Sequence, residues 1–190
     1  MYFNDFTFVC RIIQENKINE EGAIFMQKGV FDNDKLLMES LYSNGVFLIT
    51  GVDKPNIMTI GWATIGIIWR KPVMTVMVRP SRYSYELINS HPEFTVSIPE
   101  KNMSKELVFC GSRSGRDADK FNECNFTPEK SIAVKVPGIK ECNIHYECRI
   151  VHVNKVIPEN LDNKIIKQLY NEGDFHKIYF GEILGVFKKR

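Results

Sequence analysis

Residues 46–78 read VFLITGVDKPNIMTIGWATIGIIWRKPVMTVMV, and this stretch decides the fold class of the chain. Runs rich in β-branched and other apolar residues predict strands over 46–50, 58–68 and 73–78. Residues 51–56, which separate the first two runs, have the composition of a turn. Because strand follows strand with no long helix between them, the stretch predicts an antiparallel meander.

Helices and further strands are expected on both sides of this meander. Residues 1–30 alternate apolar positions loosely, and we expect an extension with one or two short strands. Apolar residues at helical spacing predict a helix over 33–43 that ends before Gly45. Downstream, the same signals predict helices over 81–90, 102–110, 116–123 and 158–170, and strands over 94–98, 132–136, 142–156 and 178–187.

The whole pattern predicts one domain over residues 31–190 that is mainly β with peripheral helices, built as a closed or nearly closed antiparallel barrel. A chain of 190 residues with 44% hydrophobic and 25% charged residues is long and apolar enough to bury a core. The net charge of +2 gives no reason to expect a nucleic-acid partner. No apolar run reaches the ~18 residues of a membrane span, and no signal peptide is recognised, so a cytoplasmic protein is expected.

The cysteine pattern argues against a metal site and against a disulfide framework. The chain has five cysteines, at positions 10, 110, 124, 142 and 148, and no two of them form C-x-x-C. No pair of histidines has metal-ligand spacing, so no metal is expected and the thiols are expected to be reduced. Because Cys110 has no second cysteine nearby in the sequence, it is interpreted as a small apolar wall residue.

Residues 79–87, RPSRYSYEL, place basic and hydroxyl side chains around the start of a predicted helix. A helix N-terminus exposes unpaired N–H groups and a partial positive charge, which suit a phosphate. Ser81, the expected N-cap, and Ser84 can donate hydroxyls, and the guanidinium groups of Arg79 and Arg82 match phosphate oxygens. Taken alone, the segment also fits a capped helix with surface arginines.

Residues 56–62, NIMTIGW, read as a strand edge that can border a planar aromatic ligand. Backbone groups at the edge and the Thr59 hydroxyl can hydrogen-bond the pyrimidine part of an isoalloxazine, while Met58 and Trp62 can cover ring faces. The alternative is an ordinary core strand, and Trp69 and Arg70 are themselves assigned to packing and turn roles. A flat ring next to a phosphate site describes flavin mononucleotide (FMN).

Residues 109–121, FCGSRSGRDADKF, form a third polar segment with special backbone positions. Gly111 and Gly115 let the backbone approach a neighbour closely, because neither carries a Cβ. A surface loop between two helices is the alternative for this segment alone.

In this order and spacing, the three segments resemble the flavin reductase-like, FMN-binding split-barrel family, which includes the flavoredoxins. Residues 136–141, which lead into HYECRIV at 145–151, and GDFHKIYFGEI at 173–183 fit the same family. The resemblance covers roughly residues 45–187. It implies a homodimer of antiparallel split barrels with one FMN per subunit near the dimer interface.

The resemblance also implies roles for single residues. The residues implied to border the isoalloxazine are Asn56, Met58, Thr59 and Trp62. Those implied to hold the phosphate and ribityl end are Arg79, Ser81, Arg82, Tyr83 and Ser84. The loop beside the ring is implied to contain Cys110, Gly111 and Ser112, with Lys120 and Phe121 closing it. Ser84 stands where many relatives have threonine, and Phe175 separates Asp174 from His176, which are adjacent in some members.

His176 is the expected catalytic residue. The resemblance places it near the reactive face of the flavin of its own or of the partner subunit. There it is expected to favour the anionic reduced flavin or to relay a proton.

Three functions follow from these segments. The first is an oxidoreductase in which NADH or NADPH reduces FMN, which passes electrons to free flavin, a ferric complex or a redox protein. The second is a flavoredoxin-type electron carrier without direct nicotinamide use. The third is a non-catalytic flavin-binding module, against which the phosphate segment argues. No G-x-G-x-x-G fingerprint separates the first two, since the family does not use one.

Overall fold

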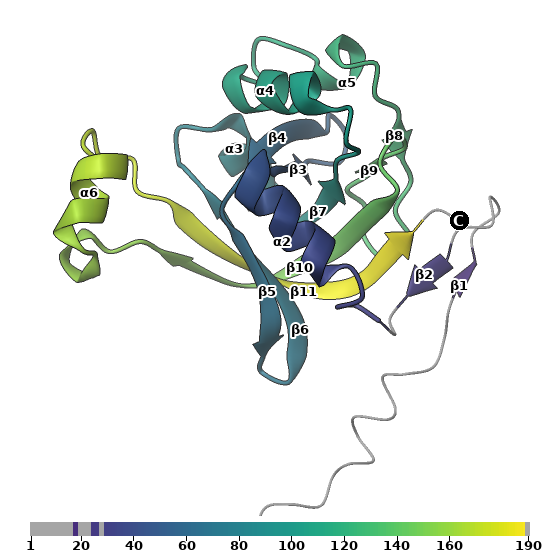
Figure 1. Cartoon of the computed structure of the whole chain (residues 1–190), viewed down its shortest axis with the longest axis horizontal. Helices are drawn as coiled ribbons and strands as arrows, with labels where there is room; N and C mark the ends of the chain where they lie inside the picture. The colour runs from purple at the N-terminus through teal and green to yellow at the C-terminus, as the bar shows by residue number, and fades with distance from the viewer. Residues whose placement is uncertain (1–16, 19–23, 27–28, 189–190) are drawn as a thin grey trace, which may run out of the picture.

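The computed structural model describes residues 17–18, 24–26 and 29–188 (Figure 1). Its strands are β1 Lys17–Ile18, β2 Ile24–Met26, β3 Val46–Thr50, β4 Asn56–Ile60, β5 Ala63–Ile68, β6 Lys71–Val78, β7 Glu93–Ile98, β8 Pro128–Glu129, β9 Gly138–Ile139, β10 Ile144–Lys155 and β11 Lys177–Lys188. Its helices are α2 Asp34–Ser43, α3 Tyr83–Ser90, α4 Ser104–Ser112, α5 Lys120–Glu123 and α6 Asn163–Leu169, with a 3₁₀ turn, η2, at Pro158–Asn160.

One antiparallel sheet holds nine of these strands. Its order is β1-β2-β11-β10-β7-β3-β4. β6 pairs with residues 177–182 of β11, on the same edge that β2 uses at residues 186–188, and β6 also pairs with β5. Neither β5 nor β6 pairs with β4, so the sheet curls without closing and β4 is left as an open edge. The prediction of a mainly β, antiparallel split barrel with peripheral helices is confirmed.

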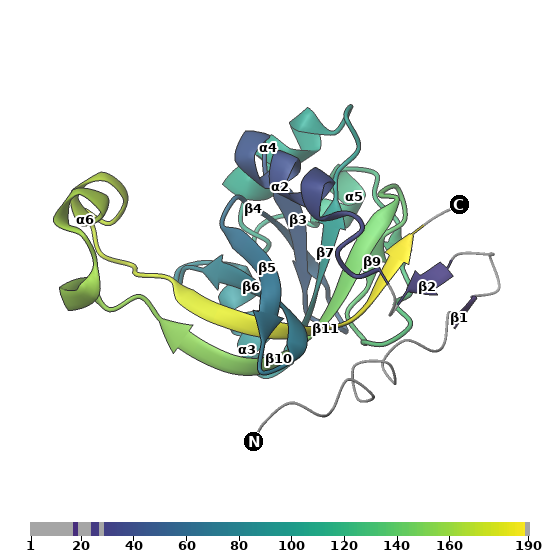
Figure 2. The same cartoon turned by 60° about the horizontal axis from the view of Figure 1, so that its bottom comes forward.

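The long strands β10 and β11 extend beyond the barrel. Figures 1 and 2 show them leaving it as a two-stranded arm, with α6 at the far end. The first five residues of β10 are buried, whereas most of its remaining residues are exposed. Two irregularities in the β10–β11 register, at Glu147/Cys148 and Ile150/His152, separate the barrel part from the arm. Such bulges increase the local bend and twist of a strand pair.

The core lies on both faces of the central strands. Leu48 and Met74 belong to the cluster inside the barrel, whereas Phe47 and Ile49 belong to a second cluster on the opposite face. Successive residues of a strand point to opposite faces, so β3 is buried throughout because residues such as Leu107 of α4 cover its outer side. This double burial explains the apolar run over residues 46–49 of β3.

Several predicted elements are confirmed, with end shifts of a few residues. The helix over 33–43 is α2, the strand over 46–50 is β3, and those over 94–98, 142–156 and 178–187 are β7, β10 and β11. The predicted strand over 58–68 is two strands, because the chain leaves the ladder at Gly61 and Trp62.

The predicted strand over 132–136 is wrong. The backbone N–H groups of Ile132 and Ala133 donate to the carboxylate of Glu147, at distances of 3.0 and 2.6 Å, instead of to a neighbouring strand. Burial raises the pKa of this carboxyl group, and the backbone hydrogen bonds oppose the rise. A side chain of β10 therefore takes the place of a strand partner.

Three helices start later than predicted or are interrupted. α4 is shifted to Ser104–Ser112. α5 begins at Lys120 because the side chain of Asp119 accepts from the N–H of Asn122 and caps it there. The helix over 158–170 divides into η2 and α6, since Asp162 caps α6 through the N–H of Lys164. Pro158 does take the first helical position, as expected.

Of the extension expected over residues 1–30, the structure describes β1, β2 and residues 29–30. β2 pairs with the end of β11, with Phe25 opposite Phe187. The boundary at residue 30 stays a prediction, and residues 1–16, 19–23 and 27–28 of the expected extension lie outside the described ones. Among the helices of the described residues, none is long and apolar enough to cross a membrane.

Gly181 is a packing constraint at the junction of the barrel and the arm. A Cβ at this position would lie 2.6 Å from ring atoms of Phe94 and 2.9 Å from the Cβ of Cys148. We predict that Gly181→Ala lowers the free energy of unfolding by about 1–3 kcal/mol through overpacking, measured by urea denaturation. The matched control is Gly66→Ala in β5, where a Cβ meets nothing within 4 Å. If both variants have wild-type stability, the junction is not tightly packed.

Candidate functional site

Two adjoining pockets lie at the open edge of β4, next to the start of α3 and the end of α4. Their volumes are about 190 and 130 Å³. Met58, Arg82 and Gly111 line both pockets. A ligand that occupies one pocket can therefore continue into the other.

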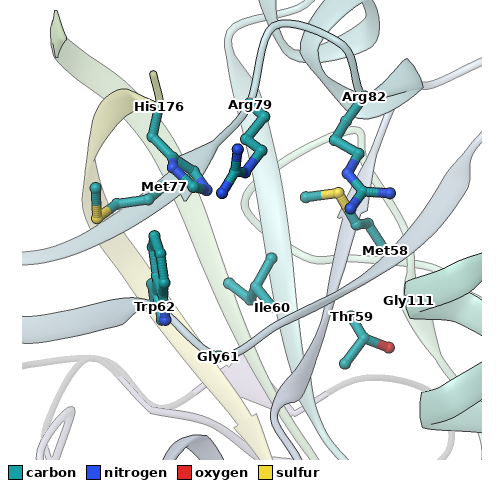
Figure 3. A pocket seen from close by; sticks show the side chains of 10 residues that line it. All are labelled: Met58, Thr59, Ile60, Gly61, Trp62, Met77, Arg79, Arg82, Gly111 and His176. Atoms are coloured by element: carbon teal, nitrogen blue, oxygen red, sulfur yellow. The ribbon is translucent and has the colours of Figure 1, made fainter. Parts of the chain in front are cut away.

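The larger pocket has aromatic and sulfur-containing walls and is called the ring pocket below. It is lined by Met58, Thr59, Ile60, Gly61, Trp62, Met77, Arg79, Arg82, Gly111 and His176. In Figure 3, Trp62, Ile60 and Thr59 lie along one side of the space, and His176, Arg79 and Arg82 approach from the opposite side.

The open edge of β4 offers backbone hydrogen bonds to this pocket. The carbonyl of Ile57 accepts from the side chain of Lys120 and so points away from β3. Along an antiparallel strand, residues whose backbone groups point toward the partner strand alternate with residues whose backbone groups point away from it. Thr59 lies two residues after Ile57, so its N–H and C=O also point away from β3. The Thr59 hydroxyl donates to the carbonyl of Leu107 at 2.7 Å and ties α4 to this edge.

The smaller pocket is polar and basic and is called the anion pocket below. It is lined by Asn56, Met58, Ser81, Arg82, Tyr83, Ser84, Cys110, Gly111, Arg113, Ser114, Gly115, Arg116 and Lys120. The start of α3 lies here, so the helix presents its unpaired N–H groups to the pocket. The predicted phosphate segment and the predicted glycine-containing loop thus meet at one place.

Ser81 is not the N-cap of the helix. α3 begins at Tyr83, and Arg82 takes the cap position. The N–H and hydroxyl of Ser81 both donate to the carboxylate of Asp174, at 3.2 and 2.6 Å. A carboxylate from the distant arm, which helical periodicity does not reveal, therefore holds Ser81.

Ser84 and Asn56 form a buried pair at the wall of the anion pocket. The side-chain amide of Asn56 donates to the Ser84 hydroxyl oxygen at 2.9 Å, which leaves the hydroxyl hydrogen of Ser84 to donate elsewhere. A Cβ at Gly115 would lie 1.9 Å from the side-chain oxygen of Asn56, so only glycine fits. Gly111 lies in the last turn of α4, not in a turn after it. A Cβ at Gly111 would lie 3.3 Å from the Cβ of Thr59.

The arginines of the predicted phosphate segment have different surroundings. The guanidinium group of Arg79 donates to the carbonyl of Leu169 at 2.7 Å and lies 5.0 Å above the ring of Tyr170. Arg79 thus ties the arm to the barrel while it lines the ring pocket. Arg82 is exposed and lines both pockets. Arg116, which sequence reasoning missed, pairs with Glu86 and lies over Tyr83.

Lys120 is a buried cation in the wall of the anion pocket. Its ammonium group donates to the carbonyls of Ile57 and Cys110, at 2.7 and 2.8 Å, and joins α5 to β4 and α4. Burial lowers its pKa, and nearby Arg82 adds to this effect. Phe121 is buried in the outer core and lines neither pocket, and Ser112 is exposed and donates to Val108 of its own helix.

His176 lines the ring pocket. Its ring centroid is 4.7 Å from that of Trp62, and its Nδ1 lies 2.7 Å from the hydroxyl of Tyr170. Burial, together with the charge of Arg79, lowers its pKa to about 4. At neutral pH the imidazole is therefore uncharged, so it does not supply the positive charge expected of it.

Tyr170 and Asp174 were not predicted as site residues, although both lie in or near the segment that contains His176. Tyr170 contacts Arg79 and stacks on Phe175, whose ring centroid is 4.7 Å away. Asp174 has a left-handed backbone with φ of 54°. A polar turn with an aromatic residue on each side was the available signal, but only the folded arm brings it to the start of α3.

Cys110 does have a cysteine neighbour, which corrects the prediction from spacing. The Sγ atoms of Cys110 and Cys124 are 3.8 Å apart, because the chain reverses between α4 and α5. Within the described residues, no group of three or more His, Cys, Asp or Glu side chains is arranged to hold a metal ion.

Comparison with known proteins identifies the family. A model of the flavin reductase-like domain matches residues 38–189. An uncharacterized protein of Archaeoglobus fulgidus is 34% identical over 151 residues, which are 79% of this chain and 75% of that protein. The structure of a flavoredoxin from Methanosarcina acetivorans matches with a TM-score of 0.62 at 26% identity. The match covers 93% of this chain and 76% of the flavoredoxin chain.

The flavoredoxin of Desulfovibrio vulgaris (Miyazaki F) is similar to a comparable degree. It has a TM-score of 0.61 at 25% identity, and the match covers 77% of this chain and 70% of that one. The family model spans most of the chain, including every strand from β3 to β11. The chain therefore belongs to the family of flavin reductase-like domains.

Proposed function

We propose that this protein binds one FMN per chain across the ring and anion pockets and acts as an oxidoreductase. NADH or NADPH donates the electrons, and free flavin, a ferric complex or a redox protein accepts them. The observation that carries the proposal is the direct connection between a pocket with aromatic walls and a basic pocket at a helix start. A planar ring joined through a short chain to a phosphate has this shape and this charge distribution.

The residues present fit FMN. The outward N–H and C=O of Thr59 match the hydrogen-bonding edge of an isoalloxazine. Arg82, the unused hydroxyl hydrogen of Ser84 and the start of α3 form a donor set suited to a phosphate. A Cβ at Gly115 would clash with Asn56, so glycine lets this loop pack closely against the wall of the anion pocket.

Bound FMN would supply the ability to accept and release a hydride equivalent. The chain itself orients the partners. The β4 edge holds the ring in register, Arg82 neutralises the phosphate, and Trp62 limits the movement of a planar group in the ring pocket. The hydroxyl of Tyr170 lies 2.7 Å from Nδ1 of His176, and in the tautomer in which Nδ1 accepts this hydrogen bond the imidazole carries its hydrogen on Nε2, which can donate to a ligand.

A flavoredoxin-type electron carrier is the second candidate. Two solved relatives at 25–26% identity carry the name flavoredoxin, which favours a protein that exchanges electrons with other proteins. Both candidates require the same flavin site. They differ in whether a nicotinamide nucleotide reduces the bound flavin directly.

We predict that the purified protein takes up about one FMN per chain and that Arg82→Ala and Ser84→Ala each weaken binding. Losing a charge-assisted phosphate contact costs about 1.5–3 kcal/mol, which is about a tenfold to hundredfold loss of affinity. Isothermal titration or quenching of flavin fluorescence measures the dissociation constant. A wild-type protein that binds no FMN would refute the proposed function.

Riboflavin and a distant arginine provide the controls for this experiment. Riboflavin lacks the phosphate, so its affinity should differ little between wild type and the two variants. Arg149→Ala removes an exposed arginine that pairs with Glu182 and lines neither pocket, so FMN affinity should be unchanged. Equal losses for FMN and riboflavin would show that the variants damage the fold instead of a phosphate contact.

For His176, we predict that His176→Ala slows anaerobic flavin reduction by NADH or NADPH about tenfold or more, with little change in FMN content. Tyr170→Phe keeps the aromatic ring but removes the bond to Nδ1, so a smaller loss is expected. Because the pKa of His176 is about 4, its titration should leave no step in the wild-type rate between pH 6 and 8. Stopped-flow absorbance of the flavin measures each rate.

The outcome of this experiment also separates the two candidate functions. If wild type is not reduced by either nicotinamide but is reduced by a small redox protein, the carrier function is correct. If His176→Ala is reduced at the wild-type rate, His176 has no part in the reaction.

We further propose that the protein is a homodimer, as the family resemblance implies. The β5–β6 hairpin and the outer part of β10 expose large apolar side chains that a second copy can cover. Ile67 and Trp69 are 63% and 58% exposed, and Val151 and Val153 are each 40% exposed.

Trp69 and Arg70 form the hairpin turn with left-handed backbones, and Trp69 also contacts Phe180. The turn role predicted for these two residues is confirmed.

We predict a dimer mass by size-exclusion chromatography with light scattering. A charge placed in an apolar interface is costly to bury, so Ile67→Asp combined with Val153→Asp should shift the mass toward that of a monomer. Leu36→Asp in α2, at a similarly exposed apolar position outside the hairpin and arm, is the control and should leave the dimer intact. A monomeric wild type at micromolar concentration contradicts the proposal.

A further inference from the structure

The Sγ atoms of Cys110 and Cys124 are 3.8 Å apart, and Cys110 lines the anion pocket. Cys110 lies within α4 and is fully buried, whereas Cys124 directly follows α5 and is half-buried. Between them runs the segment that carries Arg113 and Arg116, both of which line the anion pocket. The two thiols thus stand at the two ends of a pocket-lining segment.

We propose that Cys110 and Cys124 are a redox-active thiol pair that closes to an intramolecular disulfide and locks the segment between α4 and α5. The oxidant is a disulfide of a small thiol, such as oxidised glutathione, or of a protein. Each cysteine loses one hydrogen and the Sγ–Sγ bond forms, while the two electrons and two protons convert the external disulfide to two thiols. A reducing dithiol reverses the step.

The geometry allows this bond. The two Sγ atoms must approach from 3.8 Å to about 2.05 Å. Cys110 is held by the core that packs around α4, so the movement falls on Cys124. Cys124 lies at the end of a four-residue helix and is followed by Asn125 in a left-handed conformation, where the chain turns. Rotation of the Cys124 side chain and a small shift of this turn supply the approach.

The surroundings set the order of the exchange. Burial raises the pKa of both thiols, and that of Cys110 is raised well above the usual range. Glu106 adds to the rise at both cysteines and Glu123 adds to it at Cys124, while the ammonium group of Lys120 acts in the opposite direction. Cys124 is the more accessible thiol, so it attacks the external disulfide, and Cys110 then displaces the bound half.

Closure of the disulfide acts on the pocket through short connections. Lys120 already joins the carbonyl of Cys110 to β4, and Gly111, the next residue, lines both pockets. A covalent bond between Cys110 and Cys124 limits the local opening of the segment between them, because it removes most of the conformations available to the open loop. The lock does not depend on which ligand the pockets bind.

Peptide mapping tests whether the bond forms. Trypsin releases Cys110 in ELVFCGSR, residues 106–113, and Cys124 in FNECNFTPEK, residues 121–130. After native protein is treated with oxidised glutathione and free thiols are alkylated, mass spectrometry without reduction should find these two peptides joined and two hydrogens lighter than their sum. Dithiothreitol should separate them. The joined pair should be absent in Cys124→Ser and present in Cys10→Ser. Folded wild-type protein that yields only unlinked or glutathione-bound peptides overturns the proposal.

Limited proteolysis tests the lock without reference to FMN. Arg113 and Arg116 are exposed, so trypsin can cleave the native protein there when the segment opens locally. Oxidised protein should be cleaved at least about threefold more slowly than reduced protein, since the disulfide lowers the population of the open segment. Cys124→Ser should be cleaved at one rate under both conditions. Equal rates for oxidised and reduced wild type would show that the bond does not lock the segment.

Discussion

The open edge of β4 is the constraint on which the rest of the structure depends. Buried backbone groups need hydrogen-bond partners, and in the described sheet no strand pairs with the outer edge of β4. Lys120 satisfies the carbonyl of Ile57, and the hydroxyl of Thr59 holds α4 beside the strand. The outward backbone groups of Thr59 are left to face the ring pocket. The gap that the fold leaves is therefore also the place where a planar ligand with a polar edge fits.

The arm completes the site from a distant part of the chain. Arg79 holds the carbonyl of Leu169, and Asp174 accepts both hydrogen bonds from Ser81. These contacts bring His176 and Tyr170 against the ring pocket, more than a hundred residues after β4. A cation and an anion thus fix the arm to the barrel. Arg79 lines the ring pocket, and Ser81, which Asp174 holds, lines the anion pocket, so the arm is attached to the barrel at residues of the two pockets.

The sequence predicted well wherever local pattern and tertiary environment agree. The first four residues of β3 are apolar and the strand is buried on both faces, so it was recognised from composition alone. Prediction failed where a distant side chain replaces a local partner. The strand expected over 132–136 is absent where the N–H of Ile132 donates to Glu147. Ser81, the expected N-cap of α3, donates to Asp174 instead. The proximity of the two cysteines depends on the reversal between α4 and α5, which spacing does not show.

The titratable and charged side chains around the pockets differ in burial, and burial affects their charge. His176 is neutral because burial and the nearby arginine oppose its protonation. A negative charge that develops on a ligand is therefore stabilised by cations. Arg82 reaches both pockets but is exposed, where solvent weakens its field. Lys120 is buried, and its ammonium group has three hydrogens, of which two bind protein carbonyls. A buried cation acts more strongly over the same distance, but burial also lowers the pKa of Lys120, so the permanent positive charge of the anion pocket comes from the arginines that line it, Arg82, Arg113 and Arg116.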